Sequence, residues 1–552
     1  MKRIRLLFLL LLLSSFLLAQ PKHEVRAVWL TTIGGIDWPH SYAQSARSIE
    51  RQKEELRQTL DRLRQAGINT VLLQTRIRGT VIYPSAYEPW DGCLSGQPGR
   101  SPGYDALAFA IDECHRRGME LHAWVVTIPV GKWTGKGCTS LRKRYPNLIK
   151  KIGTDGYMDP ENAQTARYLA DICGEITDHY DIDGIHLDYI RYPETWTLKV
   201  SRQRGREYIT SIVEAISQRV KKAKPWVKMS CSPIGKYDDL TRYWSHGWNA
   251  YTTVCQDAQG WLRRGLMDEL FPMMYFRDNN FYPFAIDWAE ESAGRIVVPG
   301  LGIYFMSPRE KNWPLSDITR EMEVLRANGM GQAFFRSKFF TDDTKGIYRF
   351  SKDRFYQYPA LVPPMTWEGK REVKAPKNLT IKKCGKNTAR LSWSHTDDKH
   401  DGMLYYNVYA SHECPVDISD ARNLILPRTP LSSIIIPLDA SRHYAITAMD
   451  RYGNESAPLQ EYGVGNGTGP QPTKATEFLP CDGHTLTLPD KGSTLDADYV
   501  AIETLQGTVV AVRPYTGTTL DVNRLNNGLY ILRSLGRKGR THRLGFFMVK
   551  RF

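Results

Sequence analysis

Hydrophobic and polar positions follow two different periods along the first part of the chain. From about residue 24 to residue 358, short and almost uninterrupted apolar runs take turns with longer segments in which apolar residues recur every three or four positions. The first pattern is typical of strands buried on both faces, and the second of amphipathic helices. The predicted strands are residues 25–33, 70–77, 121–128, 184–190, 227–233, 269–276, 296–303 and 331–337.

Helical segments separate these strands. They are residues 45–66, 104–117, 161–178, 202–222, 254–264, 281–293 and 318–327. Regular alternation of strand and helix predicts the α/β class, and eight such strands predict a (β/α)₈ TIM barrel over residues 21–358. The longest loops follow the second, third and fifth strands. In this fold the loops at the carboxyl ends of the strands surround the active site.

The pattern changes after Pro359, where prolines cluster and only strand-like alternation remains. Residues 375–460 resemble a fibronectin type III domain, with Pro376 at the start, Trp393 in the second strand and Tyr444 near the end. A Gly- and Pro-rich linker then leads to an all-β segment, residues 475–552. This segment resembles the C-terminal sorting domains of type IX secretion substrates, and a plain accessory β-sandwich is the alternative. The barrel is expected to fold without either β-domain.

The N-terminus has the pattern of a signal peptide, residues 1–20. Lys2, Arg3 and Arg5 precede a short apolar run, and Ala19 offers a cleavage site. No apolar run of membrane-spanning length follows, so the mature chain is expected to be exported, to the periplasm or to the outer-membrane or cell surface. The net charge of +15 favours an anionic partner such as a cell-wall or acidic polysaccharide. Nucleic acid is disfavoured, because no binding motif accompanies the charge.

The nine cysteines contain no CxxC pair and no metal-ligand spacing, so neither a metal nor another cofactor is expected. Cys93 and Cys138 fall in predicted loops and could pair in an oxidising compartment. Cys114, Cys173 and Cys255 fall in or beside helical patterns and are predicted to be buried thiols.

The segment Asp183-Gly-Ile-His-Leu-Asp-Tyr-Ile-Arg-Tyr-Pro193 carries the strongest chemical signal. Asp188 lies near the carboxyl end of a predicted strand, where barrel enzymes place catalytic groups, and Tyr189 and Arg191 follow at once. Glycoside hydrolysis needs two carboxyl groups, one to protonate the leaving oxygen and one to attack the sugar or activate water. Asp183 and Asp268 precede their strands and are predicted to be structural.

Motifs at many strand ends fit one family pattern. They are Glu24-Val-Arg-Ala-Val-Trp-Leu30, Asn69-Thr-Val-Leu-Leu-Gln-Thr-Arg76, His122-Ala-Trp124, the segment around Asp188, Ser232-Pro233 and Phe271-Pro-Met-Met-Tyr275. Together they resemble the glycosyl-hydrolase-like family ten of bacterial exported proteins, over about residues 23–350. The resemblance implies a (β/α)₈ barrel that cleaves peptidoglycan glycan strands lacking stem peptides.

Asp188 is therefore the first predicted catalytic carboxylate, and its partner is open. Glu194 is favoured, because the family pattern often carries a Glu followed by Thr in this loop, although the loop is much shorter here. Asp257 is the second choice, and it could instead be a charge at the start of a helix. Asp37 and Asp278 are further candidates.

Polar and aromatic residues at the other strand ends are predicted to bind the sugar chain. They are Gln74, Arg76, Trp124, Tyr189, Arg191, Tyr275, Tyr304 and Arg336. The predicted function is an exported glycoside hydrolase acting on peptide-free peptidoglycan glycan. The alternatives are a glycan-binding protein with a degenerate barrel, and a hydrolase of another bacterial or host polysaccharide.

Overall fold

The computed structural model describes residues 20–243, 247–369, 371–395, 404–460, 479–489, 497–504, 509–536 and 541–550. Almost all of the predicted signal peptide, and the Gly- and Pro-rich linker, lie outside these residues. The chain divides into two compact units: Lys22–Glu461 is one, and the described residues after 478 belong to the other.

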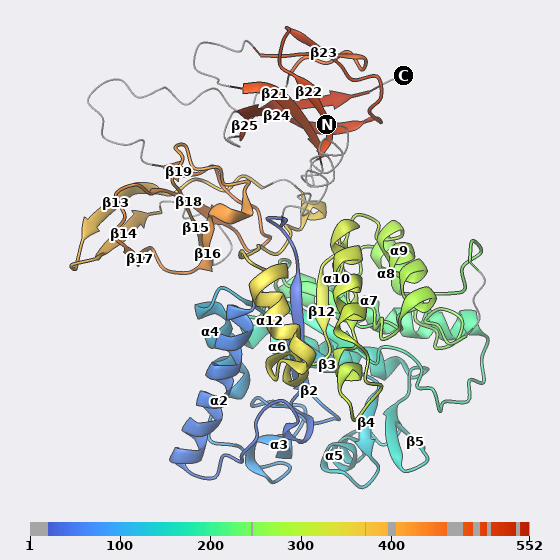
Figure 1. Ribbon diagram of the computed structural model, residues 1–552. Coiled ribbons are helices and arrows are strands. Elements are labelled where there is room, and N and C mark those ends of the chain that lie inside the picture. The colour runs from blue at the N-terminus through green and yellow to red at the C-terminus, as the bar shows by residue number, and fades with distance from the viewer. Residues whose placement is uncertain are drawn as a thin grey trace. The chain divides into compact units, whose positions relative to one another are not determined.

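The first unit contains all eight predicted barrel strands, and helices cover their outer side (Figure 1). The strands are β1 (Arg26–Leu30), β2 (Thr70–Arg76), β3 (Glu120–Val126), β7 (Gly184–Asp188), β8 (Lys228–Cys231), β9 (Glu269–Leu270), β10 (Ile296–Val297), β11 (Gly300–Leu301) and β12 (Gln332–Phe334). The helices that follow the predicted pattern are α2 (Ala46–Gln65), α4 (Ala106–Arg116), α6 (Ala163–His179), α7 (Arg202–Ala223), α8 (Ala258–Arg263), α9 (Tyr282–Glu290) and α10 (Leu315–Ala327).

One short segment closes the parallel sheet into a barrel. The strand order is β10-β9-β8-β7-β3-β2-β1-β12-β11, so β10 and β11 stand at opposite ends of it. Yet both belong to the single run from Ile296 to Leu301, which the sequence predicts as one strand. Val298 N donates to Leu270 O at 2.8 Å on one side, while Gly300 pairs with Ala333 on the other. The nine strands therefore occupy eight positions around a closed barrel, which confirms the predicted fold.

The long loop after β3 contains secondary structure that the sequence pattern did not predict. It forms a three-stranded antiparallel sheet from β4 (Pro129–Lys132), β5 (Ile149–Ile152) and β6 (Asp155–Met158), with α5 (Lys136–Arg144) between the first two strands. These strands are four residues long and carry several lysines, so they lack the apolar run by which the barrel strands are recognised.

The β-rich part of the first unit consists of two antiparallel sheets around one apolar core. One sheet holds β13 (Lys377–Lys383), β14 (Thr388–Ser394) and β17 (Ser433–Pro437). The other holds β15 (Tyr405–Ser411), β16 (Leu424–Thr429), β18 (His443–Met449) and β19 (Leu459–Gln460). Trp393 and Tyr444, which the sequence singles out, both lie in the core between them.

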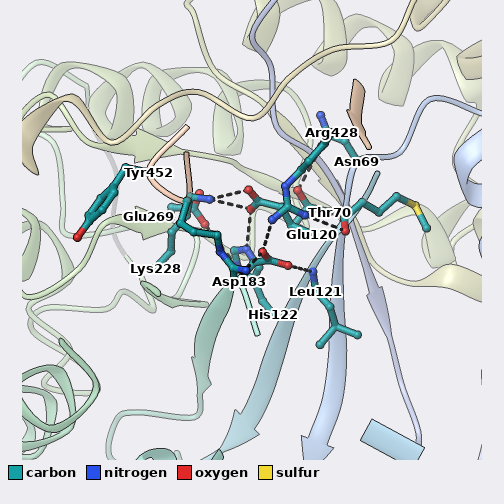
Figure 2. Close-up of polar contacts among 12 residues, drawn as sticks. Asn69, Thr70, Glu120, Leu121, His122, Asp183, Lys228, Glu269, Arg428 and Tyr452 are labelled. Carbon is teal, nitrogen blue, oxygen red and sulfur yellow. Dashed lines mark hydrogen bonds and ion pairs between the residues drawn. The ribbon is translucent and has the colours of Figure 1, made fainter. Parts of the chain in front are cut away.

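This sandwich packs against the end of the barrel where the parallel strands begin. Arg428, at the end of β16, is buried there and bonds to the Asp183 carboxylate (Figure 2). His115 Nε2 lies 2.8 Å from the same carboxyl group, and the Arg428 guanidinium stacks on Tyr405 with its central carbon 4.1 Å from the ring centroid. These cations hold the pKa of Asp183 well below its ordinary value, against the opposing effect of burial. A buried carboxylate of the barrel is thus neutralised in part by an arginine of the sandwich.

The second unit is a separate antiparallel structure. Strands β21 (Ala497–Thr504), β22 (Val509–Pro514), β24 (Gly528–Gly536) and β25 (Thr541–Val549) form one sheet, and β20 (Thr485–Thr487) pairs with β23 (Thr519–Asp521). Across the described part of the chain, no helix has the length and hydropathy of a membrane span.

The cysteines differ in part from the prediction. Cys93 and Cys138 are both buried free thiols, so the predicted disulfide between them is absent. Cys114, Cys173 and Cys255 are buried free thiols as predicted.

We expect Arg428→Ala to lower the free energy of unfolding of the first unit by about 3 kcal/mol, because it leaves the Asp183 carboxylate buried without its main cation. Urea unfolding measures this loss. Because the pKa of Asp183 is depressed in the folded state, its contribution is present at neutral pH and is lost as the pH falls below its ordinary pKa. The gap between wild type and variant should therefore narrow in acid. Arg442→Ala, which removes a half-exposed arginine from the same sandwich, is the matched control; an equal loss in both variants would contradict the expectation.

Candidate active site

The inward-facing side chains of the barrel form layers, and the topmost layer holds the candidate catalytic carboxylate. The lower part of the interior is polar and includes Glu120, His122, Lys228 and Glu269, all buried. A middle layer follows, in which Trp29 donates from Nε1 to His186 Nε2 at 3.2 Å. The top layer, at the carboxyl ends of the strands, includes Trp124, Asp188 and Ser232. The register of the parallel strands thus brings Asp188 to the rim.

Neutral groups hold the Asp188 carboxylate in place. Its Oδ1 accepts from Ser232 Oγ and from the Tyr189 backbone N–H, both at 2.8 Å. Its Oδ2 accepts from Trp124 Nε1 at 3.1 Å. A carboxylate has about four lone-pair positions, so Oδ2 keeps one for a further partner. Asp188 is therefore fixed in orientation and still able to reach a ligand.

Burial dominates the electrostatics of Asp188. It raises the pKa of the carboxyl group above its ordinary value, and the donors from Ser232, Trp124 and Tyr189 and the nearby charge of Arg191 oppose the rise only in part. The next residue, Tyr189, has a φ of 53°, in the left-handed region that a bulky residue rarely adopts. Such backbone strain is common at functional sites. Here it accompanies the turn that directs the Tyr189 N–H back to Asp188.

Arg191 pairs with the second predicted carboxyl group. Its Nη1 lies 2.7 Å from Glu194 Oε1, and the Glu194 side chain is 45% exposed. The guanidinium carbon also lies 4.4 Å from the ring centroid of Tyr189 and 5.6 Å from that of Trp248. Both aromatic rings are exposed, so they offer flat apolar faces beside the two carboxyl groups.

A second aromatic group lies beyond the carboxyl ends of β9, β11 and β12. The rings of Tyr275 and Phe335 are 5.5 Å apart between centroids, and Tyr304 is 5.9 Å from each. Burial raises the pKa of Tyr304 to about 12. Burial, and to a smaller extent the charge of Asp188, raise the pKa of Tyr275. The predictions for Tyr275 and Tyr304 thus fall at the rim.

The predictions for Gln74 and Arg76 need correction. Arg76 is fully buried and bonds to Glu88 through Nε and Nη2, and its Nη1 donates to Thr127 O at 2.9 Å. The Oε1 of Gln74 accepts from the backbone of Thr32 at 3.0 Å and of Ile33 at 2.9 Å. Both side chains hold loops at the rim. The guanidinium of Arg76 is taken up by protein groups, whereas the contacts of the Gln74 side chain involve its oxygen and not its amide nitrogen.

Trp124 and Arg336 also act on protein groups. Trp124 is buried and orients Asp188, so it is a hydrogen-bond donor and not an open platform for a sugar ring. Arg336 is partly exposed and pairs with Asp37, whose other oxygen accepts from Thr31 Oγ1 at 2.6 Å. Asp37, one of the further candidates for the second catalytic carboxyl group, is therefore engaged by protein groups.

The remaining carboxyl candidates lie outside the network around Asp188. Asp257 is the N-cap of α8: it accepts from Gly260 N at 3.0 Å and from the Tyr237 hydroxyl at 2.6 Å. Asp257 is thus a charge at the start of a helix, which was the alternative to a catalytic role. Asp278 begins a short 3₁₀ turn, Asp278–Asn280, and is exposed.

Two residues at the site were not among the predicted ones. Ser232 was noted only as part of a motif, although it follows the fifth strand at an inward position and could have been found from the strand register. Trp248 lies in the long loop after that strand, and no periodicity marks it. Among the described residues, no group of His, Cys, Asp and Glu side chains is arranged to hold a metal ion.

Comparison with known proteins agrees with this geometry. Residues 24–305 match the family described as glycosyl hydrolase-like 10. The chain is similar to glycosyl hydrolase YngK of Bacillus subtilis (strain 168), with 28% identity over 487 residues that cover 79% of this chain and 93% of the relative. It is also similar to glycosyl hydrolase DigH of Escherichia coli (strain K12), with 27% identity over 293 residues, 47% of this chain and 66% of the relative.

Among solved structures, α-L-fucosidase isoenzyme 2 from Paenibacillus thiaminolyticus aligns with a TM-score of 0.39 and 13% identity. The alignment covers 59% of this chain and 49% of that one, so this chain spans about half of that structure.

We expect Ser232→Ala to raise the pKa of Asp188 further, because the serine hydroxyl donates to the ionised form and stabilises it. Carboxyl ¹³C NMR of protein labelled at aspartate would follow the titration, with Asp188→Asn used to assign the signal. Ser230→Ala is the matched control, since Ser230 lies in the same strand but contacts His186 at 3.0 Å. An unchanged or lower pKa in Ser232→Ala would contradict the expectation.

Proposed function

Because the chain belongs to the glycosyl hydrolase-like 10 family, we propose that it is a glycoside hydrolase that cleaves the glycan strands of peptidoglycan after their stem peptides have been removed. The observation that carries the proposal is Asp188: a buried carboxyl group at a barrel strand end, oriented by neutral donors, with one oxygen position open. The peptide-free substrate is what the resemblance of the strand-end motifs implies.

The environments of the two carboxyl groups suggest their roles. A general acid needs a raised pKa so that it is protonated at the working pH, and burial raises that of Asp188. Its partner must be ionised in order to activate water or attack the sugar, and Glu194 is exposed to solvent and paired with Arg191. We therefore assign Asp188 as the acid that protonates the leaving oxygen and Glu194 as the base or nucleophile.

Accessory parts extend the proposal. We propose that the β-sandwich of the first unit is a fibronectin type III-like domain, supported by its sheets of three and four strands and by Trp393 and Tyr444 in its core. The second unit is proposed to be the sorting-type domain, in keeping with export of the chain to the periplasm or the cell surface. Tyr189, Trp248, Tyr275 and Tyr304 are proposed to contact the sugar chain.

We expect the wild-type protein to release reducing ends from amidase-treated murein, and much less from intact murein or neutral polysaccharides. Asp188→Asn should lower turnover on the order of 10³-fold while leaving folding and glycan binding intact, because the amide keeps the shape but cannot supply a proton. Reducing-sugar release over this substrate panel is the measurement. Binding without turnover by the wild type would favour a glycan-binding protein, and preference for another polysaccharide would favour a hydrolase of that polymer.

We expect a substrate with a good leaving group to separate the two roles. An aryl glycoside needs little protonation, so Asp188→Asn should lose far less activity on it than on natural glycan, and the pH profile of kcat/KM should lose its alkaline limb. Glu194→Gln should lose activity on both substrates equally. Steady-state kinetics of the two variants, each the control for the other, measure the difference. If the aryl glycoside restored the activity of Glu194→Gln and not that of Asp188→Asn, the two roles would be reversed. Full activity of Glu194→Gln on both substrates would remove Glu194 from catalysis.

A further inference from the structure

A strongly basic surface projects from the excursion after β3. Residues 129–158, here called the basic excursion, contain seven Lys and Arg residues and a single acidic residue, Asp155. They form β4, α5, β5 and β6. The excess of cations is local, since the whole chain carries 74 Lys and Arg against 59 Asp and Glu. A cluster of one sign on so short a segment creates a field that attracts an anionic partner.

Most of these cations lack an acidic partner. Lys132 pairs with Asp155 at 3.1 Å and Lys150 with Asp159 at 2.8 Å. The other five make no ion pair within the described part of the chain, and all are exposed or half-exposed. They are Lys136, Arg142, Lys143, Arg144 and Lys151. Cations that no acidic side chain neutralises keep their charge available to an anionic ligand.

An aromatic ring fixes part of this surface. The Arg142 guanidinium carbon lies 3.8 Å from the ring centroid of Trp133, and Lys151 Nζ lies 5.7 Å from it. Arg142 Nη2 also donates to Trp133 O at 2.9 Å. These contacts hold two like charges near each other without neutralising either. The cation stacked on Trp133 also covers a ring face that a nucleic-acid base would need for stacking.

The basic excursion adjoins both catalytic carboxyl groups. The excursion starts two residues after Thr127, which donates to Asp188 O from its backbone N at 2.9 Å and from Oγ1 at 2.8 Å. Its last residue, Met158, returns to the same place and donates from N to Ile128 O at 2.8 Å. On the other side, Lys150 Nζ is 5.4 Å from the ring centroid of Trp196, two residues after Glu194. A polymer that passes Asp188 and Glu194 would meet these cations next.

We propose that the basic excursion binds the carboxylates of an anionic glycan and so holds the polymer beside Asp188. This inference rests on the proposed function, and it adds a reason for the preferred substrate. A stem peptide is joined to the sugar's lactyl group through an amide, and hydrolysis of that amide leaves a free carboxylate on the glycan. The negative charge that the excursion recognises therefore appears on the strand when the peptide is removed.

The test measures binding to intact polymer, with Asp188→Asn as the background so that the glycan is not consumed. In this background we compare Lys143→Glu/Lys151→Glu with Lys382→Glu/Lys383→Glu, which makes the same charge change at exposed lysines on β13 of the sandwich. We expect the first pair to weaken binding of peptide-free glycan about tenfold at low salt, and the second pair to leave it unchanged. The difference should disappear in about 1 M salt, where the Debye length is short.

Two further arms identify the partner. Glycan whose carboxylates have been chemically reduced to alcohols should bind equally to both variant pairs, and Lys143→Ala/Lys151→Ala should show an intermediate loss on the native glycan. Equal binding of native glycan by both pairs would overturn the proposal. So would a charge-dependent preference for duplex DNA or for anionic lipid vesicles over the glycan, since either would identify a different partner.

The two proposals fail in different ways. If the wild-type protein cleaves no glycan but the Asp188→Asn background binds it through Lys143 and Lys151, then the hydrolase assignment fails and the binding surface stands. If the wild type cleaves peptide-free glycan and both variant pairs bind it equally, then the surface fails and the hydrolase assignment stands.

Discussion

Charges buried inside the barrel must be compensated within it or from its open ends, and this constraint shapes the whole first unit. Glu120 is neutralised inside the barrel by Lys228, with Nζ to Oε1 at 2.7 Å. Asp183, which precedes β7, is compensated by Arg428 of the sandwich (Figure 2) and by His115 of α4. The sandwich therefore contributes to the electrostatic balance of the barrel, in addition to covering its lower end.

Strand β7 has one carboxyl group at each end, and only one of them is fully compensated by cations. Asp183 precedes it and Asp188 ends it, so the two carboxyl groups differ mainly in their surroundings. Cations depress the pKa of Asp183, whereas neutral donors leave burial to raise that of Asp188. This difference fits a structural role for Asp183 and the catalytic role proposed for Asp188. In this fold, residues at the amino ends of the strands generally stabilise the barrel and residues at the carboxyl ends generally take part in catalysis. The two ends of β7 fit this rule.

The sequence predicted the barrel well because every barrel strand is a buried parallel strand, whose apolar run is visible without any knowledge of contacts. The same pattern predicted the position of Asp188, because a residue at the carboxyl end of a barrel strand lies at the face of the barrel that holds the active site. The failures involve partners. Arg76 lies within an apolar run, which indicates a buried and therefore paired arginine. Its partner, Glu88, lies in an irregular loop and could not be identified from the sequence pattern. Arg428 is 245 residues from Asp183, and no local period encodes such a contact. Trp124 and Gln74 were placed correctly at the rim but bond to protein groups.

The distance in sequence between Asp183 and Arg428 has a consequence for synthesis. A nascent chain that has reached residue 358 holds all eight barrel strands, yet the arginine that neutralises Asp183 has not been made. Until β16 emerges, closing the lower end would bury that carboxylate with only His115 beside it, so the native arrangement is disfavoured. Domains usually fold from the N-terminus as they are synthesised. Here we expect the order to be reversed, because the part of the first unit that is made last supplies the charge that lets the part made first complete its fold.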